Sequence, residues 1–424
     1  MNADQRLDEL LSGLQNYERT RALVTDWSLD TAHALLEGFA VRPSGGHWIQ
    51  VGGSKGKGTT VLYLEALARA AGLRTGAFMS PHLQHVRERI RVDGLPVQAS
   101  VLLQAMEGVL DKARQLGLEP SFFEAMTVAA VRIFVDAGLD VVALEVGLGG
   151  RLDATTAVPV DGTILTRMEI EHADLLGASL TQIAGEKAHI MRPGKPAWIQ
   201  PDPAVDQLFR DHADRVGADL REVPEVAELV PTVGGFSGIL RTAEFADRFE
   251  LVGASAFELP ALALSHACLR NLCPSGDWPL QPVARPTLPG RFEVLAGSDG
   301  WPFVLDGAHT PGSAEQVVAE LERRFSQQSV ALLFACAIGK QWREILSAFL
   351  PLVDRFFITP VEGTAVVPAA EVVEWLHREG KPKAQVVGNP KVGLDELKRC
   401  SAIRLVCGSF YLVGSARTHL LHDD

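Results

Sequence analysis

A glycine-rich loop with two lysines lies between a short apolar segment and a stretch with helical apolar spacing. It reads Gly52-Gly53-Ser54-Lys55-Gly56-Lys57-Gly58-Thr59. Glycine amides can close on phosphate oxygens, a helix N-terminus favours an anion, Lys57 can reach the β- and γ-phosphates, and the Thr59 hydroxyl can bind Mg²⁺. Gly58 separates Lys57 from Thr59, a departure from the strict G-x-x-x-x-G-K-[ST] pattern. The loop predicts an ATP or GTP site; the alternative is a glycine-rich turn with solvated lysines.

Two oxygen-bearing side chains stand at the ends of other apolar segments. Glu145 ends the run Val141–Leu144, where an unpaired buried carboxylate would be costly and a nearby cation would offset that cost. Ser80 follows the segment Thr75–Met79, at a strand end where parallel sheets place ligands. Both are suitable Mg²⁺ ligands. The alternatives are a hydrogen-bonded strand-end carboxylate and a turn cap.

The elements that must position these residues alternate between strand-like and helix-like patterns in the first half of the chain. The apolar residues from Leu7 to Arg42 have helical spacing. We then expect strands at His47–Val51, Thr75–Met79, Val141–Val146 and Thr163–Thr166, and helices at Thr60–Ala71, Val101–Leu116, Phe122–Ala137 and Leu180–Met191. Such alternation predicts a parallel sheet covered on both faces, with right-handed crossovers. The sequence thus predicts an α/β domain that contains the phosphate loop.

The alternation weakens between Val205 and Pro286, where only Gly238–Arg241 and Arg248–Val252 are strand-like, and it restarts after a linker at Pro286–Gly290. We then expect strands at Phe303–Leu305, Val330–Cys336, Arg355–Ile358, near Gln385 and at Ile403–Val406, and helices at Ser313–Phe325, Trp342–Leu350, Ala369–Arg378 and Leu394–Arg399. This predicts a smaller, Rossmann-like C-terminal domain. The expected domains are residues 1–288 and 289–424.

Composition limits the class of protein. A chain of 424 residues exceeds what one hydrophobic core usually serves, which agrees with two domains. The net charge of -12 disfavours a nucleic-acid partner. The five cysteines are scattered without a C-x-x-C pair, no apolar run reaches membrane length, and the opening residues do not look like a secretory signal. We expect a monomeric cytoplasmic protein with no membrane partner.

Further motifs follow the glycine loop in order. They are Ser80-Pro81-His82-Leu83, Glu88-Arg89-Ile90, the run from Glu145 to Thr155, Glu171-His172, Glu186-Lys187-Ala188, Pro289-Gly290-Arg291, Asp306-Gly307-Ala308-His309 and Gly408-Ser409-Phe410. Together with the loop, this set resembles the folylpolyglutamate and dihydrofolate synthases of the Mur ligase superfamily. The resemblance covers nearly the whole chain, and chance would not align so many separate motifs. It implies a Mur ligase-like α/β fold.

The resemblance implies a complete nucleotide and metal site. ATP would contact Gly53, Ser54, Lys55, Gly56, Lys57, Gly58, Thr59, Arg291, Asp306 and His309. Two Mg²⁺ ions would be held by Thr59, Ser80, Glu145 and His172. The catalytic set would be Lys57, Glu145, His172 and Lys187. Lys187 would be carbamylated, which turns a cation that metals repel into an anion that can support them. Without the resemblance, we would interpret His172 as a surface or core histidine and Lys187 as an exposed lysine on a helix.

The family's pterin pocket maps onto three segments. Its residues would be Trp27, Ser28, Leu29, Ser121, Phe123, Glu124, Leu152, Asp153 and Ala154. An aromatic ring such as that of Phe123 can stack on a flat heterocycle while a carboxylate accepts ring N–H groups. Without the resemblance these residues would be interpreted as core and turn positions.

Several positions depart from the family pattern. Glu171 replaces the usual Asp, and His189 stands where Gly is frequent. The segment Leu259–Ala263 lacks an asparagine that contacts ATP in the family, and Gly339-Lys340 replaces an Asp-Lys pair. Thr310, like Lys55, is of the eukaryotic type. The missing asparagine and the changed Asp-Lys pair put nucleotide affinity or base preference in doubt, whereas the phosphate and metal groups are all present.

The implied reaction is an ATP-dependent ligation of L-glutamate to a folate-type carboxyl group. It would pass through an acyl phosphate and release ADP and phosphate. The acid would be folate or dihydropteroate, which the sequence does not distinguish. Two alternatives remain: a Mur-type amide ligase for a different carboxylic acid, and a catalytically impaired nucleotide-binding paralogue, suggested by the missing asparagine.

Overall fold

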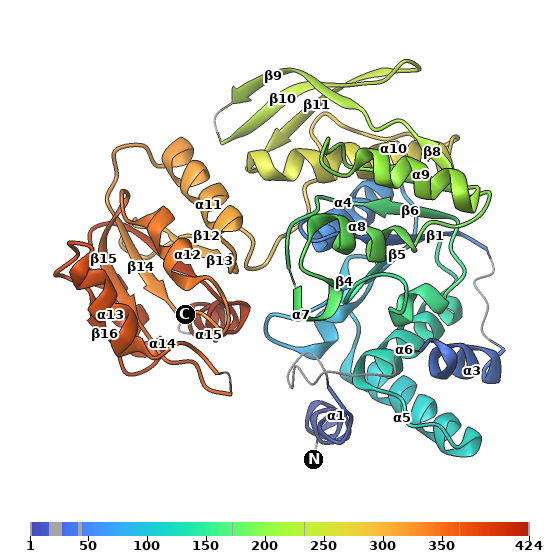
Figure 1. Cartoon of the computed structure of the whole chain (residues 1–424), viewed down its shortest axis with the longest axis horizontal. Helices are drawn as coiled ribbons and strands as arrows, with labels where there is room; N and C mark the ends of the chain where they lie inside the picture. The colour runs from blue at the N-terminus through green and yellow to red at the C-terminus, as the bar shows by residue number, and fades with distance from the viewer. Residues whose placement is uncertain are drawn as a thin grey trace. The chain divides into compact units, whose positions relative to one another are not determined.

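The computed structural model describes residues 2–16, 28–40, 45–171, 173–232, 234–363 and 365–422. These residues form two compact units (Figure 1). Unit 1 comprises Met1–His82 and Val86–Pro286, and unit 2 comprises Leu83–His85 and Thr287–Asp424. Trp27 and His172, both predicted site residues, lie outside the described residues.

Unit 1 is built around an eight-stranded sheet with the order β4-β3-β2-β5-β1-β6-β7-β8. Its strands are β1 (His47–Gly52), β2 (Thr75–Phe78), β3 (Ile90–Val92), β4 (Leu95–Pro96), β5 (Val141–Glu145), β6 (Gly162–Leu165), β7 (Pro196–Ile199) and β8 (Asp219–Arg221). Strands β2, β5, β1, β6, β7 and β8 are successive neighbours in the sheet and pair in parallel. Strands β3 and β4 add an antiparallel edge next to β2. The predicted parallel sheet is confirmed, and the antiparallel edge was not predicted.

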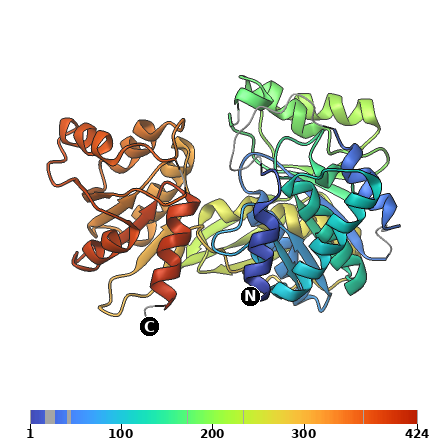
Figure 2. The ribbon, with the colours of Figure 1, turned by 90° about the horizontal axis from the view of Figure 1, so that it is seen from below.

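Helices cover both faces of this sheet (Figure 1). They are α1 (Ala3–Ser12), α3 (Asp30–Gly38), α4 (Lys57–Ala70), α5 (Ala99–Leu116), α6 (Phe122–Ala137), α7 (Ala173–Leu176), α8 (Leu180–Ala188), α9 (Asp206–Val216) and α10 (Leu259–Leu272). Alternate strand residues serve opposite faces: Val142 packs with α5 and α6, and Ala143 with α4 and α10. Figures 1 and 2 both show α1 beside α5. None of the described helices is long and apolar enough to cross a membrane.

The weakly patterned region between Val205 and Pro286 contains regular structure. Strands β9 (Glu225–Thr232), β10 (Gly235–Arg241) and β11 (Ala246–Val252) form an antiparallel sheet that includes both predicted strand-like pieces. The sequence analysis missed α9 and α10. Helix α10 buries nine successive residues, Ala261–Leu269, so it has no polar stripe from which helical spacing can be recognised.

Unit 2 contains a six-stranded sheet with the order β12-β13-β17-β14-β15-β16. Its strands are β12 (Glu293–Leu295), β13 (Phe303–Asp306), β14 (Val330–Phe334), β15 (Val353–Ile358), β16 (Gln385–Val386) and β17 (Ile403–Cys407), and its helices are α11 (Pro311–Arg324), α12 (Trp342–Phe349), α13 (Ala369–Arg378), α14 (Pro390–Lys398) and α15 (Phe410–His422). Only β12 pairs antiparallel among these strands. The predicted elements are confirmed, and β12 and α15 are additional.

A three-residue excursion of the chain, Leu83–His85, belongs to unit 2. The Gln84 side chain donates to Thr418 Oγ1 at 2.8 Å and accepts a hydrogen bond from Arg417 Nη1. The carbonyl oxygen of Leu83 lies so close to Gly414 that a Cβ there would come within 2.1 Å of it. These contacts fasten the excursion to α15.

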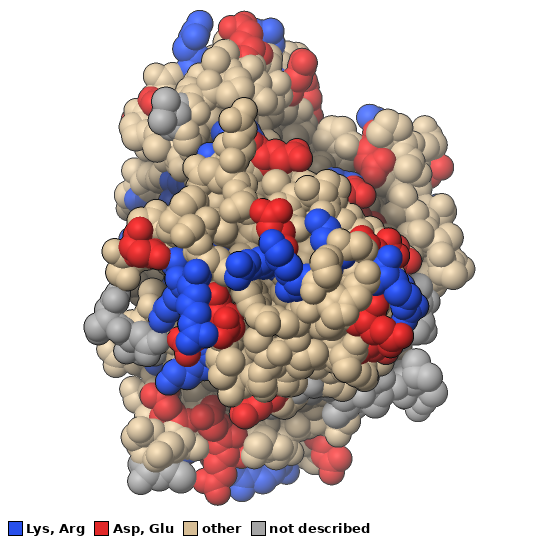
Figure 3. All heavy atoms as spheres, turned by 90° about the vertical axis from the view of Figure 1, so that its left-hand side faces the viewer, with Lys and Arg blue, Asp and Glu red and all other residues tan. Residues whose placement is uncertain are grey.

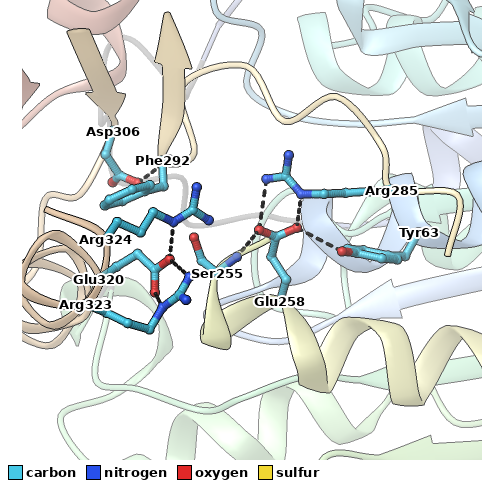
Figure 4. Close-up of polar contacts among 9 residues, drawn as sticks. All are labelled: Tyr63, Ser255, Glu258, Arg285, Phe292, Asp306, Glu320, Arg323 and Arg324. Atoms are coloured by element: carbon cyan, nitrogen blue, oxygen red, sulfur yellow. Dashed lines mark hydrogen bonds and ion pairs between the residues drawn. The ribbon is translucent and has the colours of Figure 1, made fainter. Parts of the chain in front are cut away.

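A buried carboxylate joins three segments of unit 1 (Figure 4). Glu258, which is fully buried, accepts hydrogen bonds from Tyr63 Oη at 2.8 Å, from the Ser255 amide at 2.8 Å and from Arg285 Nε and Nη2 at 2.9 Å each. Tyr63 belongs to α4, and Arg285 lies next to the last residue of unit 1. Burial, followed by the charge of Glu258, raises the pKa of Tyr63 well above its usual range. The network ties α4 to the end of unit 1.

We expect the substitution Arg285→Met to lower the free energy of unfolding by about 3–5 kcal/mol, because it leaves the Glu258 carboxylate buried without its ion-pair partner. Urea unfolding measures this loss. The control is Arg270→Met, which removes a more exposed ion pair with Asp247 and is expected to cost at most about 1 kcal/mol. Equal losses in the two variants would contradict the prediction.

Candidate active site

The glycine loop follows β1 and folds against the segment after β6. Gly53 adopts a φ of +139°, and a Cβ atom there would lie 1.9 Å from Thr166 Oγ1, so only glycine fits. The amides of Ser54 and Lys55 donate to the Arg167 carbonyl oxygen at 2.9 and 3.1 Å. The first half of the loop is therefore fixed by its own backbone contacts.

The second half of the loop is the N-terminus of α4. Gly56, the residue before the helix, has a φ of +89°, which glycine adopts without strain. The first helical hydrogen bond runs from the Thr60 amide to the Gly56 carbonyl oxygen at 2.8 Å. The amides of Lys57, Gly58 and Thr59 precede it, so they have no carbonyl partner within the helix. This is the arrangement in which helix N-termini bind phosphate.

Two lysines converge on one backbone oxygen of the loop. Lys57 Nζ donates to the Gly53 carbonyl oxygen at 3.0 Å, and Lys187 Nζ, from α8, donates to the same atom at 2.9 Å. Lys187 is 2% exposed and also lies 3.3 Å from Glu171 Oε1. Burial and then the charge of Lys57 lower the pKa of Lys187 to about 8, and Glu171 partly opposes the shift. Lys187 is thus a buried amine next to the loop, unlike the exposed lysine of the alternative interpretation.

Glu145 and Ser80 lie together at the carboxyl edge of the sheet. Val51 of β1 is in register with Glu145 of β5, so the glycine loop and this carboxylate leave the sheet at the same edge. Glu145 is 3% exposed, and its Oε2 accepts a hydrogen bond from the Ser80 amide at 3.0 Å. The parallel pairing of β2, β5 and β1 therefore brings together three segments that are far apart in the sequence.

The donor chemistry at this edge suits Mg²⁺. Carboxylate and hydroxyl oxygens, which Glu145, Ser80 and Thr59 supply, are the ligands that this ion prefers. The predicted fourth ligand, His172, is outside the described residues, so the ligand set is described only in part. Within the described part of the chain, no three His, Cys, Asp or Glu side chains form a group that could hold a metal.

The predicted pterin residues of α6 begin the helix. Ser121 and Glu124 form a capping box, in which Glu124 Oε2 accepts from the Ser121 amide at 2.8 Å and Ser121 Oγ accepts from the Glu124 amide at 3.3 Å. The Phe123 ring lies 5.6 Å from that of Phe78 and packs on Gly147, where a Cβ would come within 2.6 Å of it. The capping box holds half-buried Phe123 next to the loop that follows Glu145.

Asp153 holds that same loop. Its carboxylate accepts hydrogen bonds from the amides of Gly147, Leu148 and Thr155 at 2.9, 3.0 and 3.0 Å. Burial raises the pKa of Asp153, whereas these hydrogen bonds lower it. In this structure the carboxylate shapes the loop.

The other predicted pterin residues differ in exposure. Leu29 and Leu152 are half-buried, Ala154 is buried, and Ser28 is exposed. The Ser28 hydroxyl accepts a hydrogen bond from the Asp30 amide at 3.2 Å, at the start of α3.

Unit 2 carries the remaining predicted nucleotide residues in one cluster. Asp306, at the carboxyl end of β13, accepts hydrogen bonds from the amides of Phe292 and Ala308, both at 2.7 Å. The Phe410 ring centroid lies 5.4 Å from the Arg291 guanidinium and 6.0 Å from the His309 ring. Phe410 thus brings Arg291 and His309 together.

Phe410 was missed as a site residue. It was recognised only within a motif, although its position directly after a buried strand, in Gly-Ser-Phe, was a usable signal. Gly307 must lack a side chain for this packing, because a Cβ there would come within 2.6 Å of the Phe410 ring.

Comparison with known proteins identifies the family. Residues 290–410 match the Mur ligase, glutamate ligase domain. The dihydrofolate synthase/folylpolyglutamate synthase of Escherichia coli K12 is 30% identical over 413 residues, which cover 96% of this chain and 95% of that protein. The chain belongs to the dihydrofolate synthase/folylpolyglutamate synthase family.

Solved structures of this family have the same fold. Escherichia coli FolC in complex with DHPP and ADP has a TM-score of 0.84 and 27% identity, over 100% of this chain and 99% of that one. A bifunctional folylpolyglutamate synthase/dihydrofolate synthase with Mn, AMPPNP and L-glutamate bound has a TM-score of 0.79 and 28% identity, over 95% of this chain and 96% of that one. The predicted Mur ligase-like fold is confirmed.

The structure shows the surroundings of two positions that depart from the folylpolyglutamate synthase pattern. Ala261, within the segment that lacks the family asparagine, is 4% exposed in α10 and offers no polar group. His189 ends α8, where its ring packs edge-on against His212 with the centroids 4.9 Å apart. A histidine is therefore accommodated at this position by packing against α9.

Proposed function

We propose that the chain joins L-glutamate to the carboxyl group of a folate-type acid at the expense of ATP, as its membership of the folylpolyglutamate synthase family implies. The observation that carries this proposal is the edge of the unit 1 sheet. There the N-terminus of α4, two lysines that donate to one carbonyl oxygen and the Glu145–Ser80 pair lie together.

In the first step, a carboxylate oxygen of the acid attacks the γ-phosphorus of ATP. The bond from phosphorus to the β-γ bridging oxygen breaks, which leaves an acyl phosphate and ADP. The amides at the start of α4 bind the phosphates, and the Lys57 ammonium stabilises the negative charge that develops on the transferred group. Thr59, Ser80, Glu145 and His172 would hold Mg²⁺, which supplies further charge neutralisation when bound.

In the second step, the amine of L-glutamate attacks the acyl carbon. A carbon–nitrogen bond forms, the carbon–oxygen bond to phosphate breaks, and the amine releases a proton.

Arg291, Asp306 and His309 are the residues of unit 2 that we assign to the nucleotide. Phe123 is the residue of unit 1 that we assign to the face of the pterin ring.

Lys187 would act as a carbamate. The ammonium first loses one proton; the neutral amine then attacks CO₂, a nitrogen–carbon bond forms and a second proton leaves, so the side chain changes from a cation to an anion. Because the pKa of Lys187 is lowered to about 8, the neutral amine is present at pH values well below those at which an ordinary lysine loses its proton. The buried position beside Lys57 suits an anion better than a second ammonium.

The test is phosphate release from ATP with Mg²⁺ and L-glutamate, measured separately with dihydropteroate and with tetrahydrofolate. Stimulation by either acid, lost when EDTA removes the metal, supports the ligase. Stimulation by neither acid, in a protein that still binds ATP, would favour a ligase for another acid or an impaired paralogue. The monomeric state and the cytoplasmic location stay predictions.

A further inference from the structure

A pocket of about 690 Å³ lies in unit 2, at the amino ends of β14, β15 and β17. Its walls come from the starts of these strands and from the two chain segments that follow α13 and α14. They are residues 329–331, 354–355, 380–383 and 399–402. This is the edge of the sheet opposite to Asp306 and the nucleotide cluster, because β13 runs parallel to these strands and Asp306 is at its carboxyl end.

The pocket gathers positive charge in a protein whose net charge is -12. Arg355, Lys381, Lys383 and Arg399 line it, and Asp354 is the one acidic residue of its lining. Figure 3, which looks onto the left-hand side of Figure 1, shows Lys and Arg side chains gathered near the middle of the view. The pocket lining itself carries four cationic side chains against one acidic side chain, a local concentration of positive charge.

Local backbone irregularity contributes to this concentration. In the pairing of β14 with β15, Val330 is opposite Val353 but Ala331 is opposite Arg355, so Asp354 is an extra residue. Such a bulge re-aims neighbouring side chains. Asp354 and Arg355 are consequently both exposed, although successive residues of a regular strand point to opposite faces.

Two of the four cations are already anchored. Lys381 Nζ donates to the Val353 carbonyl oxygen at 3.0 Å and lies 5.9 Å from the centre of the Phe356 ring, which fixes its stem on the pocket wall. Arg399 forms an ion pair with Glu396. Even with Glu396 and Asp354 counted, the four cations leave an excess of two positive charges. A small anion that entered would meet one lysine, Lys381, that is already held in place, which reduces the entropy lost on binding.

We propose that this pocket is a binding site for a small polyanion whose carboxylates or phosphates pair with Arg355, Lys381 and Lys383. Its volume falls within the range of small-molecule sites. The proposal is independent of the ligase activity, because the nucleotide cluster of unit 2 lies at the other edge of the sheet.

Isothermal titration calorimetry of the full-length chain tests the site with two probes, tripolyphosphate and γ-linked triglutamate. The Lys57→Ala background is used because it weakens binding of either probe at the glycine loop. Lys383→Glu is expected to weaken binding about tenfold, because it reverses an exposed charge at the pocket rim. The control, Lys391→Glu, makes the same charge change on the same unit outside the pocket lining and should alter the dissociation constant less than twofold.

The two probes distinguish the source of the charge. Binding of tripolyphosphate alone assigns a phosphate ligand, binding of triglutamate alone assigns a polycarboxylate, and binding of both assigns the shared chemistry. Arg355→Gln provides a second variant and should also weaken binding. Binding of neither probe, or an equal loss in Lys383→Glu and Lys391→Glu, would overturn the proposal. Turnover by Lys383→Glu, measured separately, should equal that of the unaltered protein.

Discussion

Replacing Lys57 by alanine is expected to lower kcat by about 10²–10³-fold, as removal of a preorganised charge from a transition state typically does. Lys57 is the first residue of α4, and its Nζ lies 3.0 Å from the Gly53 carbonyl oxygen, inside the loop that we assign to the triphosphate. The substitution leaves the backbone of the loop unchanged, since Ser54 and Lys55 keep their bonds to Arg167. Steady-state phosphate release with saturating acid and L-glutamate measures the effect.

Lys391→Ala is the matched control, because it removes the charge of an exposed lysine outside both proposed sites. It should retain full turnover. Urea unfolding of Lys57→Ala should show a free energy within about 0.5 kcal/mol of the unaltered protein, as partly exposed positions usually do. Full activity in Lys57→Ala would remove its assigned role in phosphoryl transfer.

Replacing Lys187 by methionine is expected to lower kcat by a similar factor, about 10²–10³-fold, because both the amine and its carbamate are lost. Methionine matches the buried stem of this 2%-exposed side chain, so the packing of α8 is retained. The measurement has two parts: turnover, and ¹³C NMR of the protein equilibrated with ¹³C-bicarbonate. We expect a carbamate resonance in the unaltered protein that is absent from Lys187→Met.

The control for this experiment is Lys195→Met, which removes a half-exposed lysine that pairs with Asp161 at 3.0 Å. It should keep both the resonance and the turnover. A protein that shows no carbamate resonance but loses activity in Lys187→Met would assign the catalytic role to the free amine instead.

Most of the sheet architecture could be predicted from the sequence, because fully buried parallel strands such as β5 are short continuous apolar runs between helices of recognisable spacing. Helix α10 could not be recognised in this way, since it is buried almost all round and its apolar residues follow no stripe. The excursion of Leu83–His85 into unit 2 also has no sequence signal, because it depends on tertiary contacts with Gly414 and Arg417.

The site was predictable to the extent that strand order determines it. Glu145 and the glycine loop meet because β1 and β5 are neighbours in register. The contact between Lys187 and Gly53 joins residues 134 positions apart, and no spacing rule predicts it. The sequence analysis reached Lys187 only through the family resemblance. The hydrogen-bonding of Asp153 within its own loop likewise depends on the conformation of residues 147–155 and was not predicted.

Lys57 and Lys187 lie close together because both donate to the Gly53 carbonyl oxygen. Their proximity makes the protonation of Lys187 and the binding of a triphosphate interdependent. Since the ammonium of Lys57 contributes to the lowered pKa of Lys187, an incoming triphosphate that offsets the Lys57 charge must raise that pKa. By reciprocity, the protonation state of Lys187 changes the affinity for the triphosphate by the same factor. For the carbamate that we propose at Lys187, this coupling favours the reaction with CO₂ while the loop is empty, and we therefore expect the carbamate to form before the nucleotide binds.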